Sequence, residues 1–160
     1  MRAAGASLIS TLAAGGPYMI ADLYTLTLAN GGASYYWTTC EVDLTVSAQL
    51  FQSVSDVGVP SIKRGGMRTE AGISVSTVEV TLGVGNVGTQ PAIGGLSLPL
   101  AAVNGLLDGA TIKIDRLFMG PKGWGDTSLG TMAWFYGQVS DIDPTSTTVK
   151  LLSAGPGLRS

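Results

Sequence analysis

The chain has 160 residues, of which 12% are charged and 23 are glycine, so charge is about half and glycine about twice the usual share. A hydrophobic fraction of 45% excludes a disordered tail. A formal net charge of −2 gives no excess of basic residues of the kind that binds nucleic acid. The absence of histidine and the single cysteine exclude a Ser-His-Asp triad, a histidine-ligated metal site and an internal disulfide built from this chain alone.

The first element that the sequence predicts is a short helical segment over residues 1–16. Leu8, Ile9 and Leu12 follow a helical spacing, and two glycines and a proline then end the segment. A secretory signal is the alternative, but glycine and hydroxyl residues interrupt the apolar core that such a signal needs. No stretch approaches the roughly 18 apolar residues of a membrane span. We expect residues 17–160 to form a single β domain.

A β-hairpin is predicted next. Residues 20–28 alternate between two faces in a run of aliphatic, tyrosine and threonine side chains, which favours a strand. The Asn-Gly pair at residues 30–31 is the strongest short signal for a hairpin turn. Residues 34–39, with three consecutive aromatic side chains, form the return strand.

Shorter elements follow in the middle of the chain. Residues 48–53 contain Leu50 and Phe51 as apolar anchors, and residues 61–64 form either a short strand or part of a long loop. Further strands are predicted over residues 73–82, 110–118, 131–141 and 147–153, with a turn at residues 143–145.

One more helix is predicted over residues 96–107, after a glycine-rich linker at residues 83–95. Its expected apolar face is Leu100, Val103, Leu106 and Leu107. The last strand is expected to be anchored by Leu151 and Leu152.

The fold class predicted from these elements is all-β, with one or two short helices. The sequence gives roughly six to eight strands, and the connections between them are too short for repeated βαβ crossovers. We therefore expect an antiparallel β-barrel or β-sandwich.

A dinucleotide-binding motif is the most tempting chemical match. Residues 83–88 read Gly-Val-Gly-Asn-Val-Gly directly after a predicted strand. The third glycine must lie at the start of a helix that holds the pyrophosphate, and Pro91 with a further glycine pair excludes such a helix here. We reject the motif and expect no cofactor.

Two pairs of carboxylates have the spacing of one strand face. Glu41 with Asp43, and Asp141 with Asp143, could bind calcium or act as an acid and a base. Neither pair lies in a calcium-loop pattern, and a turn is the simpler interpretation of Asp143 before proline. We therefore expect no metal site, no catalytic residue and no enzyme activity.

The aromatic side chains point instead to assembly. Three consecutive aromatic residues on one strand must point to both of its faces. In a monomer one of these faces would be exposed to solvent, so a partner that packs against it is favoured. The suspected assembly contacts are Trp37, Lys63, Arg64, Arg68, Trp124 and Trp134.

A resemblance to a known family begins with the short N-terminal helix and the hairpin that contains residues 23–26 and 30–32, and four segments then carry it further. They are Thr-Thr-Cys-Glu-Val-Asp-Leu-Thr at residues 38–45, Gly-Ile-Ser-Val-Ser-Thr-Val-Glu-Val at 72–80, Asp-Gly-Ala-Thr-Ile-Lys-Ile at 108–114 and Gly-Gln-Val-Ser-Asp-Ile at 137–142. In this order across residues 5–153, the chain resembles the N-terminal part of DUF2163-type baseplate hub or tail-tip proteins of tailed phages, also found in gene transfer agents. The Asp-His pair of that family is Thr39-Cys40 here, so no role of that pair is carried over.

The resemblance implies a tail-tube-like β domain in a structural virion protein. Such a protein would sit at the tail tip after assembly in the host cytoplasm, and would join the tail tube to distal tip proteins as a cyclic homo-oligomer. The implied partners are copies of the chain itself in a trimer or hexamer, the tail tube protein and other baseplate proteins, without specific nucleic-acid binding. A distal tail protein ring is the alternative within this class. A carbohydrate- or receptor-binding β-sandwich using Trp124 and Trp134, and a hydrolase using the carboxylate pairs, are the alternatives from other classes.

Overall fold

The computed structural model describes residues 20–29, 32–56, 59–65, 68–69, 76–83, 92–93, 96–119, 126–144 and 148–155. The strands are β1 Ile20–Thr27, β2 Ser34–Thr38, β3 Leu44–Val46, β4 Gln49–Ser53, β5 Ser61–Arg64, β6 Arg68–Thr69, β7 Ser76–Gly83, β8 Ala92–Ile93, β9 Leu96–Ser97, β10 Thr111–Phe118, β11 Thr131–Pro144 and β12 Thr148–Gly155, and the helix is α2 Leu98–Val103. The helical segment predicted over residues 1–16 and the glycine-rich motif after Gly83 lie outside the described residues.

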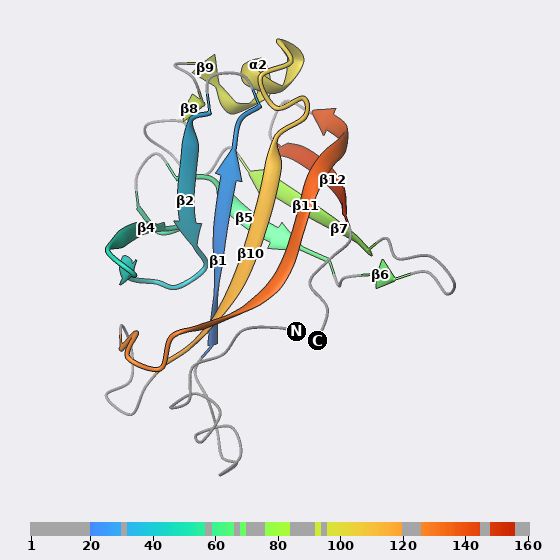
Figure 1. The fold of residues 1–160 in the computed structure, drawn as a ribbon. Helices are drawn as coiled ribbons and strands as arrows, with labels where there is room; N and C mark the ends of the chain where they lie inside the picture. Colours follow the sequence, from blue (N-terminus) through green and yellow to red (C-terminus); the bar gives the residue numbers. More distant parts are fainter. Residues whose placement is uncertain are drawn as a thin grey trace.

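One large sheet contains most of these strands (Figure 1). Its order is β3-β4-β2-β1-β10-β11-β12-β7-β5, with β6 also paired to β7, while β8 and β9 form a separate pair. Neighbouring strands are antiparallel except β2 and β4, which run parallel. The predicted all-β class and antiparallel arrangement are confirmed.

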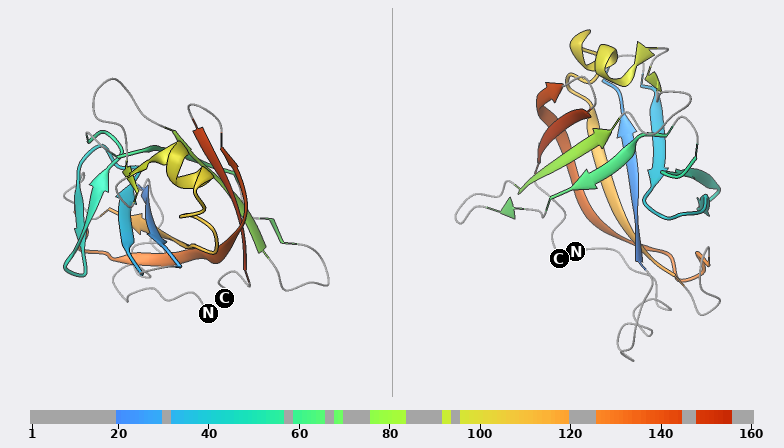
Figure 2. Two further views of the ribbon diagram at one scale, coloured as in Figure 1. Left: turned by 90° about the horizontal axis from the view of Figure 1, so that it is seen from above. Right: turned by 180° about the vertical axis from the view of Figure 1, so that it is seen from behind.

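The sheet curls around the main core, as the view from above shows (Figure 2). Tyr24 and Ile112 from one half of the sheet line the same small apolar cavity as Val80 and Leu151 from the other half. Among the described strands, no pairing joins β5 to β3 or β4, so the sheet has two open ends. The sandwich form of the prediction is confirmed, and a closed barrel is not formed.

β1 separates two cores because its side chains alternate. Tyr24 and Leu26 face the main core, whereas Ala21 and Leu23 face a smaller one on the opposite side of the sheet. The β3–β4 hairpin covers that smaller core and contributes Phe51, whose ring meets Tyr36 edge-on at 5.5 Å.

The helix α2 lies over one end of the curled sheet (Figure 2), but with a different face inward than predicted. Leu98, Ala101 and Ala102 are buried, whereas Leu100 and Val103 are exposed. The predicted extent, residues 96–107, is also wrong, because the helix begins at 98 and ends at 103. Gly105 follows with a φ of +80°, which does not continue a right-handed helix.

Three smaller expectations are corrected at the strands. Leu50 and Leu152 are exposed, because strict alternation places only their neighbours Phe51 and Leu151 inside. β11 runs through Asp143 and ends at Pro144, so the predicted turn begins later than residue 143. The strands predicted at residues 20–28, 34–39, 61–64 and 110–118 are confirmed within a residue or two.

In the described part of the chain, no helix is long and apolar enough to cross a bilayer.

Candidate functional site

A bulge in β11 decides which aromatic side chains reach the core. Ile114 of β10 pairs with Phe135. The next residue, Asp115, pairs with Ala133, which leaves Trp134 as the extra residue on β11. A bulge can re-aim a side chain that strict alternation would send to the other face. Phe135 is fully buried and Trp134 packs against the same core, so two consecutive aromatic side chains serve the interior.

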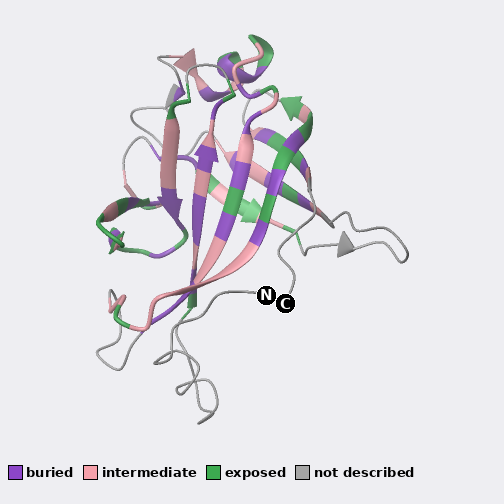
Figure 3. Cartoon of the chain, in the orientation of Figure 1, coloured by how far each residue is buried: buried purple, intermediate pink, exposed green. Residues whose placement is uncertain are grey.

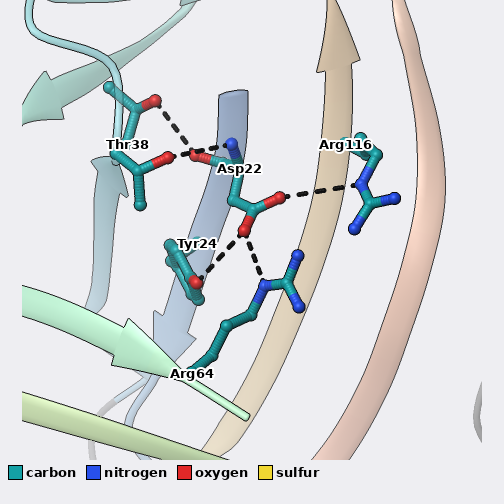
Figure 4. A network of polar contacts seen from close by, with 6 residues as sticks. Asp22, Tyr24, Thr38, Arg64 and Arg116 are labelled. Atoms are coloured by element: carbon teal, nitrogen blue, oxygen red, sulfur yellow. Dashed lines mark hydrogen bonds and ion pairs between the residues drawn. The ribbon is translucent and has the colours of Figure 1, made fainter. Parts of the chain in front are cut away.

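Asp22 of β1 lies at the centre of a polar cluster (Figure 4). Its Oδ2 atom is 2.6 Å from Nε of Arg64 and accepts a 3.4 Å hydrogen bond from the hydroxyl group of Tyr24. Its Oδ1 atom is 3.8 Å from Nε of Arg116. Because the two arginines belong to β5 and β10, three strands meet at one carboxylate. The cluster links β5, at one end of the sheet, to β1 in its interior.

The backbone of Asp22 is held by two threonines that follow one another in the chain. The hydroxyl group of Thr38 donates to the carbonyl oxygen of Asp22 at 3.0 Å, and the N–H of Asp22 donates to the hydroxyl oxygen of Thr39 at 3.1 Å. Thr38 is fully buried. The carboxylate therefore projects from a fixed point of β1 (Figure 4).

Trp134 forms an aromatic platform for both arginines. Its ring centroid is 4.1 Å from Cζ of Arg64 and 5.6 Å from Cζ of Arg116. At such distances the ring quadrupole attracts a guanidinium group, and the ring also restricts its movement. The structure thus brings together two of the predicted contact residues, Arg64 and Trp134.

The charges of the cluster are fixed by its surroundings. Burial lowers the pKa of Arg64, but the hydrogen bond and negative charge of Asp22 raise it by more, so the guanidinium group stays charged. Burial, and then the charge of Asp22, raise the pKa of Tyr24 well above its ordinary value, so its phenol stays neutral. Both effects follow from placing a carboxylate in a partly buried site.

Sequence reasoning missed the other two charged members, Asp22 and Arg116. The signal was present, because alternation places Asp22 on the same strand face as Tyr24 and Leu26, and Arg116 on the same face as Ile114. A charged residue in the apolar register of a strand needs a partner when the strand is buried. The pairing with Arg64 depends on the curl of the sheet, which alternation does not reveal.

The remaining predicted contact residues are scattered. Trp37 is 5% exposed and belongs to the main core, where its ring lies 5.8 Å from that of Tyr35. Lys63 is exposed on β5. Arg68 belongs to β6, but its side chain is not among those described, and Trp124 lies outside the described residues.

The carboxylate pairs are not brought together into one site. Asp141 and Asp143 are exposed on β11, beyond a second bulge at Ser140 that places Ile142 against the core. Glu41 and Asp43 are exposed before β3. Within the part of the chain that the structure describes, no three acidic or cysteine side chains are grouped as a metal site.

Asp43 has a carboxylate partner of its own. A hydrogen bond with Asp56, and a second from the N–H of Ser53 at 2.8 Å, lower the pKa of Asp43. The same contact with Asp43 raises the pKa of Asp56. Asp43 is exposed and Asp56 is half-buried, and their contact joins the segment before β3 to the segment after β4.

Exposed positions occur on the strands and on α2 (Figure 3), and several of them carry large apolar side chains. They are Ile20, Val42, Leu50, Leu100, Val103, Tyr136 and Leu152, of which Val103 is 71% exposed. Single exposed apolar side chains are ordinary, but Leu100 and Val103 lie together on α2.

Comparisons with known proteins find a match to one family model and a similar fold in solved structures. The family model described as "Baseplate hub protein, N-terminal attachment domain", of the phage phiJL001 Gp84 type, matches residues 5–156. A chain in the structure titled "Virion of native gene transfer agent (GTA) particle" matches with a TM-score of 0.64 and 19% identity, and thus shares the fold. The match covers 94% of the present chain and 44% of that chain, so the present chain spans less than half of its length. Comparison with curated proteins gives no match.

Proposed function

The chain belongs to the family of baseplate hub protein N-terminal attachment domains, and from this premise we propose that it joins the tail tube to the distal tip proteins. The family membership makes it a structural component of the tail baseplate in a phage-like or gene transfer agent virion. The observation that carries the proposal is the family match over residues 5–156, which includes every described strand and α2. A structural role without enzyme activity is part of the same proposal.

We further propose that the chain works as a cyclic homo-oligomer, a trimer or a hexamer. Two features support a surface that is covered in the assembly: charged residues make up only 12% of the chain, and α2 exposes Leu100 and Val103. A ring hides much of each subunit, so exposed apolar side chains become part of an interface. Lys63 is exposed and remains a proposed assembly contact, as do Arg68 and Trp124.

Native mass spectrometry of the purified chain tests the ring. We expect a closed trimer or hexamer at about 10 μM, the concentration range in which interfaces of standard size assemble. A ring in negative-stain images would agree with this mass. A monodisperse monomer under the same conditions would contradict the homo-oligomer.

Surface variants identify which face is used. Leu100→Lys with Val103→Lys changes the exposed side of α2, whereas Leu50→Lys changes an exposed position of β4. All three side chains are exposed, so we expect both variants to fold as the unmodified chain does. If α2 lies in an interface, the first variant loses the ring and the second keeps it.

A further inference from the structure

The cluster around Asp22 holds one more positive charge than negative charge. The guanidinium groups of Arg64 and Arg116 face a single carboxylate, and the phenol of Tyr24 is neutral. Arginine does not lose its proton in proteins. The described part of the cluster therefore retains a net charge of about +1 in a partly buried place.

Arg116 is the member whose hydrogen bonds are incomplete. Its Nε atom is buried and has no hydrogen-bond partner, since Oδ1 of Asp22 lies 3.8 Å away. An unpaired buried N–H costs free energy, so Asp22 balances the charge of Arg116 without completing its hydrogen bonds. Nε is closed to solvent, but the Arg116 side chain as a whole is 29% exposed, so an external acceptor can approach the exposed part of this side chain.

The position of the two guanidinium groups is set before any ligand arrives. Arg64 is held by its 2.6 Å contact with Asp22, and both arginines lie near the ring of Trp134. Binding to groups that are already fixed loses less conformational entropy than binding to free surface side chains. A cationic site with an aromatic wall results.

We propose that Arg116, with Arg64 beside it on Trp134, binds one carboxylate group supplied from outside the chain. A guanidinium group presents paired N–H donors in a plane, which matches the two oxygens of a carboxylate. One carboxylate brings the cluster to neutrality, whereas a phosphate dianion would leave it negatively charged.

The source of this carboxylate is a second copy of the chain, and this step rests on the proposed function. The outer face of each copy offers exposed carboxylates, namely Glu79 on β7 and Asp141 and Asp143 on β11. The charge of the arginine cluster is complementary to that face. In a ring, the outer face of one subunit would meet the arginine cluster of the next.

Titration of the isolated chain with acetate tests the site. The probes are the Nε–H resonances of the arginines and the indole fluorescence. We expect a saturable change that Arg116→Gln weakens at least about tenfold, as expected for the loss of a charge-assisted hydrogen bond. Lys113→Gln is the matched control, because it removes the same charge from an exposed position on the same strand as Arg116. The absence of saturation in the unmodified chain, or equal binding by Arg116→Gln, would overturn the site.

Two further measurements test the planar donor geometry and the choice of a carboxylate over a phosphate. Arg116→Lys keeps the charge and loses the planar donor pair, so it also binds acetate more weakly. Unchanged binding by this variant would reduce the site to simple charge screening and overturn the proposed geometry. Inorganic phosphate at pH 8 is expected to bind more weakly than acetate, and tighter phosphate binding would overturn the assignment to a carboxylate.

Mass measurement of the same samples separates this inference from the proposed function. If the unmodified chain binds acetate but stays monomeric, the carboxylate site is supported and the proposed ring is contradicted. If the unmodified chain and Arg116→Gln form equal rings, a subunit carboxylate is not the ligand. If Arg116→Gln alone loses the ring while Lys113→Gln keeps it, both the site and its source are supported.

Discussion

At the scale of single residues, the ring of Phe135 occupies the space that a side chain at position 137 would need. A Cβ atom on Gly137 would lie 2.5 Å from Cζ of Phe135 and 3.0 Å from the backbone carbon of Ala154. Real carbon atoms do not approach so closely, and Phe135 is fully buried and cannot swing away. Phe135, two positions earlier on the same strand, therefore leaves room only for glycine at position 137.

Gly137→Ala is therefore expected to lower the free energy of unfolding by about 1–3 kcal/mol, the usual cost of overpacking a core. Urea denaturation measures this change. Gly65→Ala is the control, because a Cβ atom there meets nothing within 4 Å. Equal stability of the two variants would contradict the close packing.

The polar cluster gives a second residue-scale prediction. Asp22→Asn leaves the charges of Arg64 and Arg116 near one another without a counter-charge. We expect a loss of about 1–3 kcal/mol in urea denaturation, below the usual cost of breaking a fully buried pair because these side chains are partly exposed. Asp141→Asn changes an exposed carboxylate and is expected to stay within about 0.5 kcal/mol. A neutral effect of Asp22→Asn would show that the cluster does not hold β5 in place.

Asp115 supplies a prediction about pH. Burial raises the pKa of this carboxyl group, and Lys113 at 3.6 Å offsets part of that shift. The folded chain then binds the Asp115 proton more readily than the unfolded chain. Its contribution to stability is present at low pH and is lost as pH rises through the raised pKa of the folded state.

Asp115→Asn is expected to be more stable than the unmodified chain at pH 7. The two are expected to be equally stable below the ordinary aspartate pKa of about 3.9, where the carboxyl group is protonated in both states. Thermal unfolding across this pH range is the measurement. If the difference in stability between the two proteins grew towards low pH, the predicted effect of Asp115 would be contradicted.

At the scale of elements, the β3–β4 hairpin carries strain in its turn. Val46 pairs with Gln49, and both residues between them have positive φ, 51° for Ser47 and 65° for Ala48. A two-residue hairpin of this kind requires positive φ at both positions, where glycine and asparagine are favoured over alanine.

Ala48→Gly is expected to raise the free energy of unfolding by about 0.5–1 kcal/mol, since glycine has no Cβ penalty at positive φ. Ala133→Gly, in β11 without positive φ, is expected to lower it instead. Urea denaturation of the two variants should give changes of opposite sign. Destabilisation by both would mean that the turn is not strained.

The same scale shows what sequence patterns can and cannot predict. Regular alternation correctly predicted β1 and β10, because Tyr24 and Leu26 of β1 and Ile112 and Ile114 of β10 face the main core. Alternation does not reveal that Trp134 and Phe135 both reach the core, because the bulge depends on the register with β10. The face of α2 was wrong for a related reason: six residues are too few for periodicity to decide between Ala101 and Leu100 as the buried side chain.

At the scale of the whole molecule, the short segments that resemble baseplate hub proteins predicted the family, and composition agreed with it. Few charges and many glycines favoured a structural β domain, and the family match agrees. The arginine cluster could not be predicted in this way, because Asp22 and Arg64 lie on strands that meet only through the curl of the sheet. The proposed subunit contact therefore depends on a cluster that is formed by strands distant in the sequence.

The position of β1 at the centre of the sheet has a consequence for the time course of folding. Its neighbour β10 is distant in the chain, since Ile20 pairs with Phe118 and Thr27 with Thr111. Non-local pairing of this kind is typical of domains that fold in milliseconds to seconds. During synthesis, the β1–β2 hairpin exposes an unpaired edge until β10 has emerged from the ribosome, and such edges promote aggregation. The interval between the synthesis of β2 and that of β10 is therefore a period in which this edge is open to aggregation.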